Sequence, residues 1–311
     1  MELPRLQLSV PLLSHSAQDP GTWAPRLERA QLLDRCGVDR LVVSEHVVFG
    51  ERLDEYGRPE LGGSKGGQQP TGSDGHWLDP LILLSHVSAL TTNIRLATGV
   101  LLAAIRRPVS LAKEAATLDV LSRGRLDIGV GVGWQREEYE AAGLSFGERG
   151  RLLDHTLEVC RELWTETVAD YDSKYLHFER IHQMPKPLQP TGVPIWVSGT
   201  INAATARRLA RFGMGWIPWG PDAADLINSI PRMRNAIEAA GGDPTNLQVV
   251  GRLQPVHDPA GAVNADAIAD GATALAEAGV TDLRATFVPS DSHAAEDLLL
   301  ELAPLIHQIQ N

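Results

Sequence analysis

The feature that most constrains the fold is an unbroken strand–helix–strand pattern in the first half of the chain. Residues 94–102 form an aliphatic and β-branched run, which is typical of a strand buried on both faces. Pro108 follows at a position where the first turn of a helix tolerates a missing N–H, and apolar residues then recur at helical spacing over residues 109–121. Gly124 suits a left-handed helix cap, and a second buried run covers residues 126–132. The pattern predicts two parallel strands joined by a helical crossover.

Strand and helix patterns alternate eight times along the chain, which is typical of a (β/α)8 TIM barrel of the α/β class. Barrels of about this length form one domain, so residues 1–311 are predicted to be a single domain. The predicted strands cover residues 6–10, 40–44, 94–100, 126–132, 194–198, 214–218, 247–254 and 282–288. Helices are predicted to begin near Thr22, Asp79, Pro108, Glu148, Asn202, Pro221, Ala262 and Ser292.

Two connections are too long to be simple turns. Residues 45–78 are rich in glycine, proline and charge, and they follow the carboxyl end of a strand, where barrels place their binding sites. We therefore expect them to form a lid, with disorder as the alternative. Residues 167–192 follow the fourth helix and so begin at the opposite end of the barrel. They are predicted to form a structural excursion or a dimer contact.

Charge and cysteine content disfavour several classes of function. The net charge of -11 argues against a general nucleic-acid surface or an anionic-membrane surface. Cys36 and Cys160 fall in distant helix-patterned segments without metal-ligand spacing, so neither a zinc site nor a disulfide is predicted. None of the four lysines ends a predicted strand, which disfavours a Schiff-base barrel. The first residues lack a signal-peptide pattern and no long apolar run occurs, so a cytoplasmic location is expected.

Polar side chains and glycines gather where predicted strands end. Residues 44–46 (Ser-Glu-His) directly follow the second strand and are expected to point into the mouth of the barrel. Gly129, Gly131 and Gly133 alternate along the fourth predicted strand, so they are expected to face one side and to leave space for a flat ring or for tight packing. Residues 198–200 (Ser-Gly-Thr) precede a predicted helix, whose N-terminus predicts an anion site, with simple helix capping as the alternative.

An ordered set of motifs in this region closely resembles the luciferase-like flavin and deazaflavin oxidoreductases. That family's pattern is a strand ending in Thr/Gly-Val, an R-x-P turn, a helix with A-K-x-x-A-T-L-D, then S-x-G-R-L and G-x-G-x-G-W. In this sequence the pattern reads Thr98-Gly99-Val100, Arg106-Arg107-Pro108, Ala112-Lys113, Ala116-Thr117-Leu118-Asp119, Ser122-Arg123-Gly124-Arg125-Leu126 and Gly129 to Trp134. A lone glycine-rich turn is a weak signal, whereas this ordered set is specific.

The resemblance implies a flavin-type ring at the mouth of the barrel. By analogy, the cofactor is held by Ser44, Glu45, His46, Thr98, Gly99, Val100, Gly131, Val132, Gly133, Trp134, Ser198, Gly199 and Thr200. A cis peptide bond is expected between Gly99 and Val100, at the rear of the ring, and an ordinary trans strand end is the alternative. His46 and Glu45 are the candidate catalytic residues, with His46 either donating or accepting a proton or only contacting the ring.

The motifs look most like the deazaflavin-dependent branch, so the activity they imply is hydride transfer between coenzyme F420 and a small-molecule substrate. Val132 stands where bacterial luciferase has an arginine that helps hold the flavin phosphate, which disfavours an FMN site. Glu45 and Ser198 also depart from the family's usual aspartate and glycine. An FMN-dependent monooxygenase that uses reduced flavin and O2, and a non-catalytic cofactor-binding protein, are the alternatives. His15 and Trp77 are expected in the substrate pocket or at its rim, no metal is expected, and the resemblance implies a homodimer.

Overall fold

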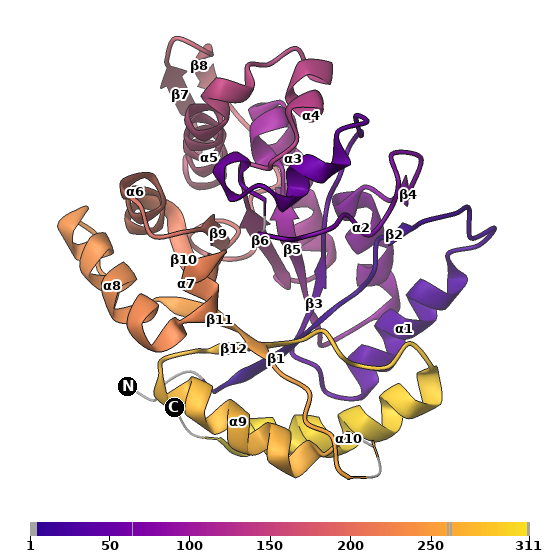
Figure 1. Cartoon of the computed structure of the whole chain (residues 1–311). Coiled ribbons are helices and arrows are strands. Elements are labelled where there is room, and N and C mark those ends of the chain that lie inside the picture. Colours follow the sequence, from indigo (N-terminus) through magenta and orange to yellow (C-terminus); the bar gives the residue numbers. More distant parts are fainter. Residues whose placement is uncertain (1–4, 64, 260, 262, 310–311) are drawn as a thin grey trace.

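The computed structural model describes residues 5–63, 65–259, 261 and 263–309, and it confirms the (β/α)8 barrel (Figure 1). Parallel strands close the barrel in the order β1-β12-β11-β10-β9-β6-β5-β3. The predicted strands are confirmed, although the fourth ends at Val130 and the last at Ala285, so both are shorter than predicted. The strands are β1 (Gln7–Pro11), β3 (Arg40–Val43), β5 (Arg95–Leu101), β6 (Leu126–Val130), β9 (Ile195–Gly199), β10 (Gly213–Pro218), β11 (Gln248–Leu253) and β12 (Asp282–Ala285).

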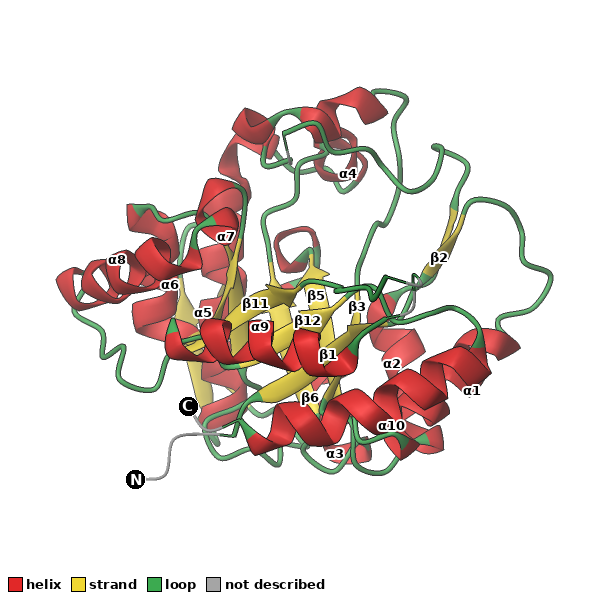
Figure 2. Ribbon diagram, turned by 60° about the horizontal axis from the view of Figure 1, so that its bottom comes forward, coloured by secondary structure: helices red, strands yellow, loops and turns green. Residues whose placement is uncertain are grey.

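Helices surround the barrel, as Figure 2 shows for α1, α9 and α10. They begin close to their predicted starts, except that the start predicted near Ala262 lies outside the described residues. Asp79 illustrates how a start is set, because its Oδ1 accepts hydrogen bonds from the amides of Leu81 and Ile82 while Pro80 occupies the first turn. The helices are α1 (Ala24–Arg35), α2 (Pro80–Leu90), α3 (Pro108–Leu121), α4 (Arg136–Ala141), α5 (Arg149–Thr165), α6 (Ala203–Phe212), α7 (Pro221–Ala224), α8 (Leu226–Ala239), α9 (Ala265–Glu277) and α10 (Ser292–Gln308).

Two small antiparallel sheets lie outside the barrel, and the sequence patterns did not predict them. Strands β2 (His15–Ser16) and β4 (His76–Trp77) pair with each other beside the mouth of the barrel. Strands β7 (Ala169–Asp172) and β8 (His177–Ile181) form a hairpin within residues 167–192. The hydroxyl of Tyr171 lies 3.0 Å from His155 Nδ1 and so attaches the hairpin to α5. The excursion predicted for this segment is therefore an ordered hairpin.

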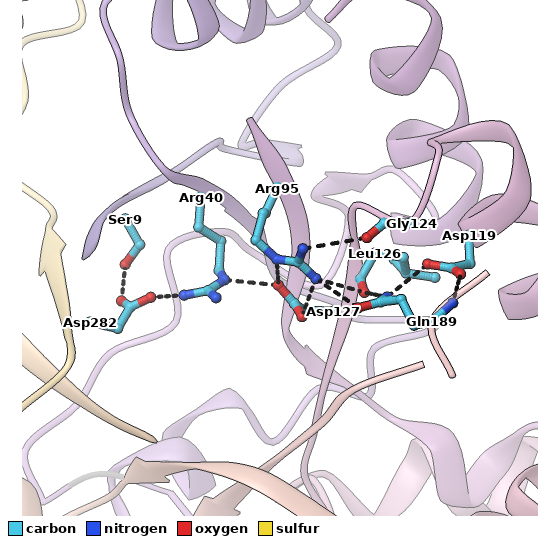
Figure 3. A network of polar contacts seen from close by, with 9 residues as sticks. All are labelled: Ser9, Arg40, Arg95, Asp119, Gly124, Leu126, Asp127, Gln189 and Asp282. Atoms are coloured by element: carbon cyan, nitrogen blue, oxygen red, sulfur yellow. Dashed lines mark hydrogen bonds and ion pairs between the residues drawn. The ribbon is translucent and has the colours of Figure 1, made fainter. Parts of the chain in front are cut away.

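A network of buried charges fills the barrel at the amino ends of its strands (Figure 3). Arg40 bridges Asp282 and Asp127, with its Nε 3.0 Å from Asp127 Oδ2. Arg95 Nε reaches the same Asp127 oxygen at 2.7 Å, and Ser9 donates to Asp282. Burial alone would raise the pKa of Asp127, but Arg40 and Arg95 outweigh it and hold that pKa below its usual value. These ion pairs form a charged layer at the amino ends of the strands, here called the charged floor of the barrel. The space at the carboxyl ends of the strands lies on the other side of this layer.

Three further observations bound the chemistry of the described part of the chain. Cys36 and Cys160 are both free and buried. Within the described ranges, no cluster of three or more His, Cys, Asp or Glu side chains is placed to hold a metal ion. Across the same residues, none of the helices has the length and apolar character needed to span a membrane.

Candidate active site

A cavity of ≈ 360 Å³ opens at the carboxyl ends of the barrel strands. Its walls come from the ends of β3, β5, β6, β9, β10 and β12 and from the start of α6. The loop over residues 45–78 covers part of it with Tyr56, Pro59 and Gly62. Trp219 Nε1 donates a hydrogen bond of 3.0 Å to the carbonyl oxygen of Gly63, which ties this loop to the segment after β10. The loop thus covers the cavity as a lid would, and its opening and closing stay a prediction.

The structure brings most of the predicted cofactor-holding residues to the wall of this one cavity. Thr98 is the exception, because its buried side chain donates from Oγ1 to the carbonyl oxygen of Gly129 at 2.8 Å and ties β5 to β6. Larger hollows, of ≈ 560 to ≈ 730 Å³, lie between outer helices and collect none of these residues. The predicted residues on the wall are Ser44, Glu45, His46, Gly99, Val100, Gly131, Val132, Gly133, Trp134, Ser198, Gly199 and Thr200.

His15 and Trp77, predicted for the substrate pocket, lie behind the cavity wall and do not line it. They are register partners in the small β2–β4 sheet, and their rings stack with centroids 4.2 Å apart. The Trp77 ring also meets the His46 ring edge-on at 4.9 Å. His15 and Trp77 therefore pack against each other, and Trp77 packs against His46 on the side away from the cavity. This agrees with the alternative interpretation, in which the two residues lie at the rim and do not enter the pocket.

The end of β5 gives the cavity an apolar wall. The predicted cis peptide bond between Gly99 and Val100 is confirmed. A Cβ on Gly99 would lie 2.5 Å from Cγ1 of Val42, so the neighbouring strand β3 leaves no room for a larger residue. Val100 packs against the inward-facing cluster of Trp196, Ile217 and Val250. The strand end thus presents a half-buried valine and a bare backbone to the cavity.

The three glycines after Ile128 do not share one strand face, which corrects the prediction. Strand β6 ends at Val130, and Gly133 adopts a left-handed φ of 69° beyond it. A Cβ on Gly129 would lie 2.2 Å from the carbonyl oxygen of Thr98, so this glycine allows close packing of two strands. A Cβ on Gly131 would instead lie 2.7 Å from Cγ2 of Val100, at the cavity wall. Only the second glycine clears space for a ligand.

Glu45 is held by protein groups on both carboxylate oxygens. Arg106 forms an ion pair with Oε1, and the backbone amide of Leu102 donates to Oε2 at 2.5 Å. Burial raises the pKa of Glu45, although Arg106 pulls it in the opposite direction. Leu102 directly follows the strand β5, so Glu45 fixes the chain just after the Gly99–Val100 wall. This arrangement favours a structural part for Glu45 in shaping the wall.

His46 sits in a cage of protein groups at the cavity edge. Its Nδ1 lies 3.2 Å from Glu138 Oε1, and its Nε2 lies 3.2 Å from the side-chain amide nitrogen of Gln69. Glu138 is fully buried in its side chain and also accepts a hydrogen bond of 2.9 Å from the amide of Val47. Because an ionised carboxylate only accepts hydrogen bonds, Nδ1 carries the hydrogen and Nε2 accepts from Gln69. Nε2 is therefore the nitrogen that a ligand could use, once Gln69 moves away.

The predicted anion site before α6 has fewer free donors than the sequence suggested. Asn202 Oδ1 accepts hydrogen bonds from the amides of Ala204 and Thr205, so the helix caps itself. Side-chain donors that line the cavity near this helix start include the hydroxyls of Ser198, Thr200 and Thr205 and the guanidinium of Arg208. Arg208 is buried, donates to Gly150 O at 2.9 Å and pairs with Asp154. A phosphate would be held here mainly by hydroxyls and Arg208.

Several wall residues were not singled out from the sequence. Glu138 belongs to the short helix α4 and had no local signal beyond its place after the glycine-rich turn. Arg208 sits among other arginines on α6, and nothing in the sequence distinguishes it from Arg207 or Arg211. Arg284 stands inside β12, and no local signal in the sequence indicates that it lines the cavity. These side chains reach the cavity only because the barrel closes, which no local pattern reports.

Comparison with known proteins agrees with this geometry. The family model described as luciferase-like monooxygenase matches residues 7–296. An uncharacterized protein of Mycobacterium tuberculosis is 38% identical over 181 residues, which cover 58% of this chain and 64% of that protein. The matched segment thus spans less than two thirds of the relative's length.

Two solved structures share the whole barrel. An F420-dependent secondary alcohol dehydrogenase, in complex with an F420–acetone adduct, aligns with 97% of this chain and 99% of its own at a TM-score of 0.73 and 17% identity. The oxygenating constituent of 3,6-diketocamphane monooxygenase from Pseudomonas putida, in complex with FMN, aligns with 96% of this chain and 98% of its own at a TM-score of 0.71 and 16% identity. At such identities the likeness shows the fold alone.

Proposed function

This chain belongs to the luciferase-like monooxygenase family, and we propose that it is an oxidoreductase that transfers a hydride between coenzyme F420 and a small organic substrate. The observation that carries the proposal is a single cavity at the strand ends that joins the Gly99–Val100 wall to the His46 side chain. The choice of F420 rests on the Ser44–His46 triplet and the glycine-rich turn that ends at Trp134, which look most like the deazaflavin-dependent branch.

The residues of the cavity fit a flat heterocyclic ring. Its volume of ≈ 360 Å³ lies in the range of pockets that hold small ligands. Gly99 and Gly131 keep the wall bare, because a Cβ on either would lie within 2.7 Å of a valine methyl group. Apolar walls with a few placed polar groups are the usual composition of a cofactor site. The ring would rest against Val100, with its phosphate-bearing tail toward Ser198, Thr200 and Arg208.

Each protein group then has a defined task. When bound, the deazaflavin supplies the hydride chemistry, and the protein supplies placement and electrostatics. Glu45 and Arg106 hold the backbone that carries the wall, and the loop over residues 45–78 excludes water from the cavity. Glu138 fixes the imidazole of His46, so that Nε2 can accept a proton from the substrate or return one to it.

The runner-up is an FMN-dependent monooxygenase that uses reduced flavin and O2. It is supported by the FMN complex of the camphane monooxygenase, whose barrel matches this chain equally well. Against it stands Val132 on the cavity wall, where bacterial luciferase has a phosphate-binding arginine. A protein that binds the ring without turnover is the third candidate.

A side-by-side titration with F420 and FMN, followed by ring fluorescence, tests the cofactor directly. We expect micromolar or tighter binding of F420 and negligible binding of FMN. A preference for FMN would replace the proposal with the monooxygenase. Binding of neither cofactor would refute both candidates, while tight F420 binding without turnover of any donor or acceptor would favour the binding protein.

The role of His46 is tested by comparing turnover with cofactor affinity. We expect His46→Ala to lower turnover far more than it weakens cofactor binding, because the imidazole exchanges a proton with the substrate. His293→Ala is the control, since His293 is 86% exposed in its side chain on α10. An equal loss in turnover and affinity would mean that His46 only positions the ring.

We also propose that the chain is a single-domain protein that acts as a homodimer in the cytoplasm. The dimer rests on the luciferase-like family, in which homodimers are common. Sedimentation velocity at micromolar concentration is expected to give twice the mass of the chain, and a monomer under those conditions would contradict the proposal.

A further inference from the structure

The cavity contains an arginine that forms no ion pair within the part of the chain that the structure describes. Arg284 stands on β12, lines the cavity and is half-buried. Its Nε is inaccessible to solvent and has no hydrogen-bond partner among the described residues. Within those residues, the guanidinium also has no ion pair, which sets it apart from Arg40 and Arg95 in the layer below.

The carboxylates of Asp282, Glu45 and Glu138 are each engaged by another group. Asp282, two residues earlier on the same strand, accepts from Ser9 and pairs with Arg40. Glu45 is paired with Arg106, and Glu138 accepts from His46 and Val47. Burial, followed by the like charge of Arg40, lowers the pKa of Arg284 to about 10. The side chain is therefore still a cation at neutral pH.

The surroundings make this charge costly in the free protein. Side chains that share a small space inside the barrel with Arg284 include Val250 on the adjoining strand β11 and Ile217 on β10, which form an apolar cluster with Trp196. A charge held in such surroundings without a partner is destabilising. Natural proteins keep such an arrangement mainly where a ligand completes it.

The position of Arg284 points to the group that completes it. A Cβ placed on Gly99 would lie 3.5 Å from Arg284 Nη1, so the guanidinium adjoins the strand end that forms the apolar wall. A flat ligand that packs its face against Gly99 and Val100 would therefore place one of its edges next to the guanidinium of Arg284. A guanidinium binds planar oxygen acceptors in a fork.

We propose that Arg284 binds an electron-rich oxygen of the ligand that occupies the barrel. This inference rests on the proposed function, since it assumes that a flavin-type ring lies against Gly99–Val100. Two sources present such an oxygen there. One is the carbonyl-bearing pyrimidine edge of the ring, and the other is a carboxylate or phosphate of the substrate.

The test compares three variants with the wild type. Arg284→Met removes the charge at similar length, and Arg284→Lys keeps the charge but loses the fork. Arg252→Met is the matched control, because Arg252 is the register partner of Arg284 on β11 and is exposed to solvent. Each protein is titrated with F420 and with FMN, and the cofactor-loaded proteins are then titrated with sodium acetate and inorganic phosphate in a thermal-shift assay.

If the ring edge is the partner, Arg284→Met weakens binding of the preferred cofactor about tenfold or more, and Arg252→Met leaves it unchanged. If a substrate anion is the partner, cofactor affinity is kept, but stabilisation by acetate or phosphate is lost in Arg284→Met and partly restored in Arg284→Lys. In both cases the melting temperature of ligand-free Arg284→Met is at least that of the wild type, because an unpaired charge has been removed.

Two results overturn the proposal. One is that Arg284→Met behaves like Arg252→Met toward both cofactors and both anions. The other is that ligand-free Arg284→Met melts well below the wild type, because Arg284 would then support the fold. Should the wild type bind neither cofactor, the proposed function fails, and the anion titrations of the ligand-free protein still decide the role of Arg284.

Discussion

Two glycines at the carboxyl end of β6, Gly129 and Gly131, are predicted to have opposite roles, and a matched pair of alanine substitutions separates them. A Cβ on Gly129 would lie 2.2 Å from the carbonyl oxygen of Thr98, which is backbone of the adjoining strand. Because the barrel is closed, β5 and β6 cannot move apart locally. We expect Gly129→Ala to lower the free energy of unfolding by about 3 kcal/mol or more, at the upper end of overpacking costs.

Gly131→Ala meets a side chain instead of backbone. Its Cβ would lie 2.7 Å from Cγ2 of Val100, so the methyl group must move roughly 1 Å to restore a normal carbon–carbon contact. Val100 is β-branched and half-buried, and it moves most easily toward the open cavity that it lines. We therefore expect a loss of stability of about 1 kcal/mol or less, together with a loss of cofactor affinity of tenfold or more.

Urea denaturation followed by tryptophan fluorescence measures the first quantity, and cofactor fluorescence titration measures the second. The control is Gly271→Ala, because Gly271 lies on α9 with open space around it. Gly143 would not serve, because its left-handed φ of 71° would strain an alanine. Gly271→Ala should leave cofactor affinity unchanged and, because it replaces a glycine inside a helix, raise the free energy of unfolding by about 1 kcal/mol or less. Gly131→Ala with full affinity would place the ring away from Val100, and a fully stable Gly129→Ala would refute the packing argument.

Two further outcomes concern stability. Asp127→Asn leaves Arg40 and Arg95 short of a buried counter-charge, so urea denaturation should show a loss of about 3 kcal/mol, while the exposed Asp270→Asn should show none. Burial lowers the pKa of His155 in the folded protein. As pH falls, the unfolded chain therefore binds a proton at this histidine before the folded protein does. Stability is therefore expected to decline as pH falls through the ordinary histidine pKa of about 6.5, and His155→Gln should flatten that decline between neutral and mildly acidic pH. An unchanged slope would refute the assignment.

Local patterns were enough to predict the barrel because its strands and helices are each marked by local chemistry. The run over residues 126–132 is apolar at almost every position, and Asp79-Pro80 carries both a capping side chain and a proline for the first turn. The closed sheet then follows from repeated parallel crossovers. The short β2–β4 pairing was missed because two-residue strands have no period to detect.

The charged floor of the barrel shows what local patterns could not reveal. Arg40 and Asp282 are separated by 242 positions, and each stands at the start of a strand whose other residues are mostly apolar. From its local sequence alone, each of these two residues is predicted to be a solvent-exposed residue at the end of a strand. Only the register of the closed barrel places them face to face, so the buried network is a property of the closure and not of any segment.

The candidate site divides in the same way. The Gly99–Val100 wall lies on β5 and residues 44–46 directly follow β3, and both were located through motifs at strand ends. Glu138 and Arg284 line the cavity from a short helix and from β12, and Gln69 contacts His46 from a long loop, so the three come from distant parts of the chain. Sequence motifs therefore could not predict that Glu138 and Gln69 contact the two ring nitrogens of His46.

The contact between Gln69 and His46 leads to a last prediction about the loop over residues 45–78. Gln69 donates to Nε2 of His46 at 3.2 Å, and its own side-chain oxygen is buried without a partner among the described residues. Glu138 occupies the other nitrogen. If the substrate exchanges a proton with His46 through Nε2, Gln69 competes with it and must leave before the reaction. Gln69→Ala should then keep cofactor affinity and the wild-type turnover, or raise the turnover, while the exposed neighbour Gln68 gives a Gln68→Ala control without effect. A fall in turnover comparable to that of His46→Ala would show the reverse, that Gln69 orients the imidazole for catalysis and stays in place throughout.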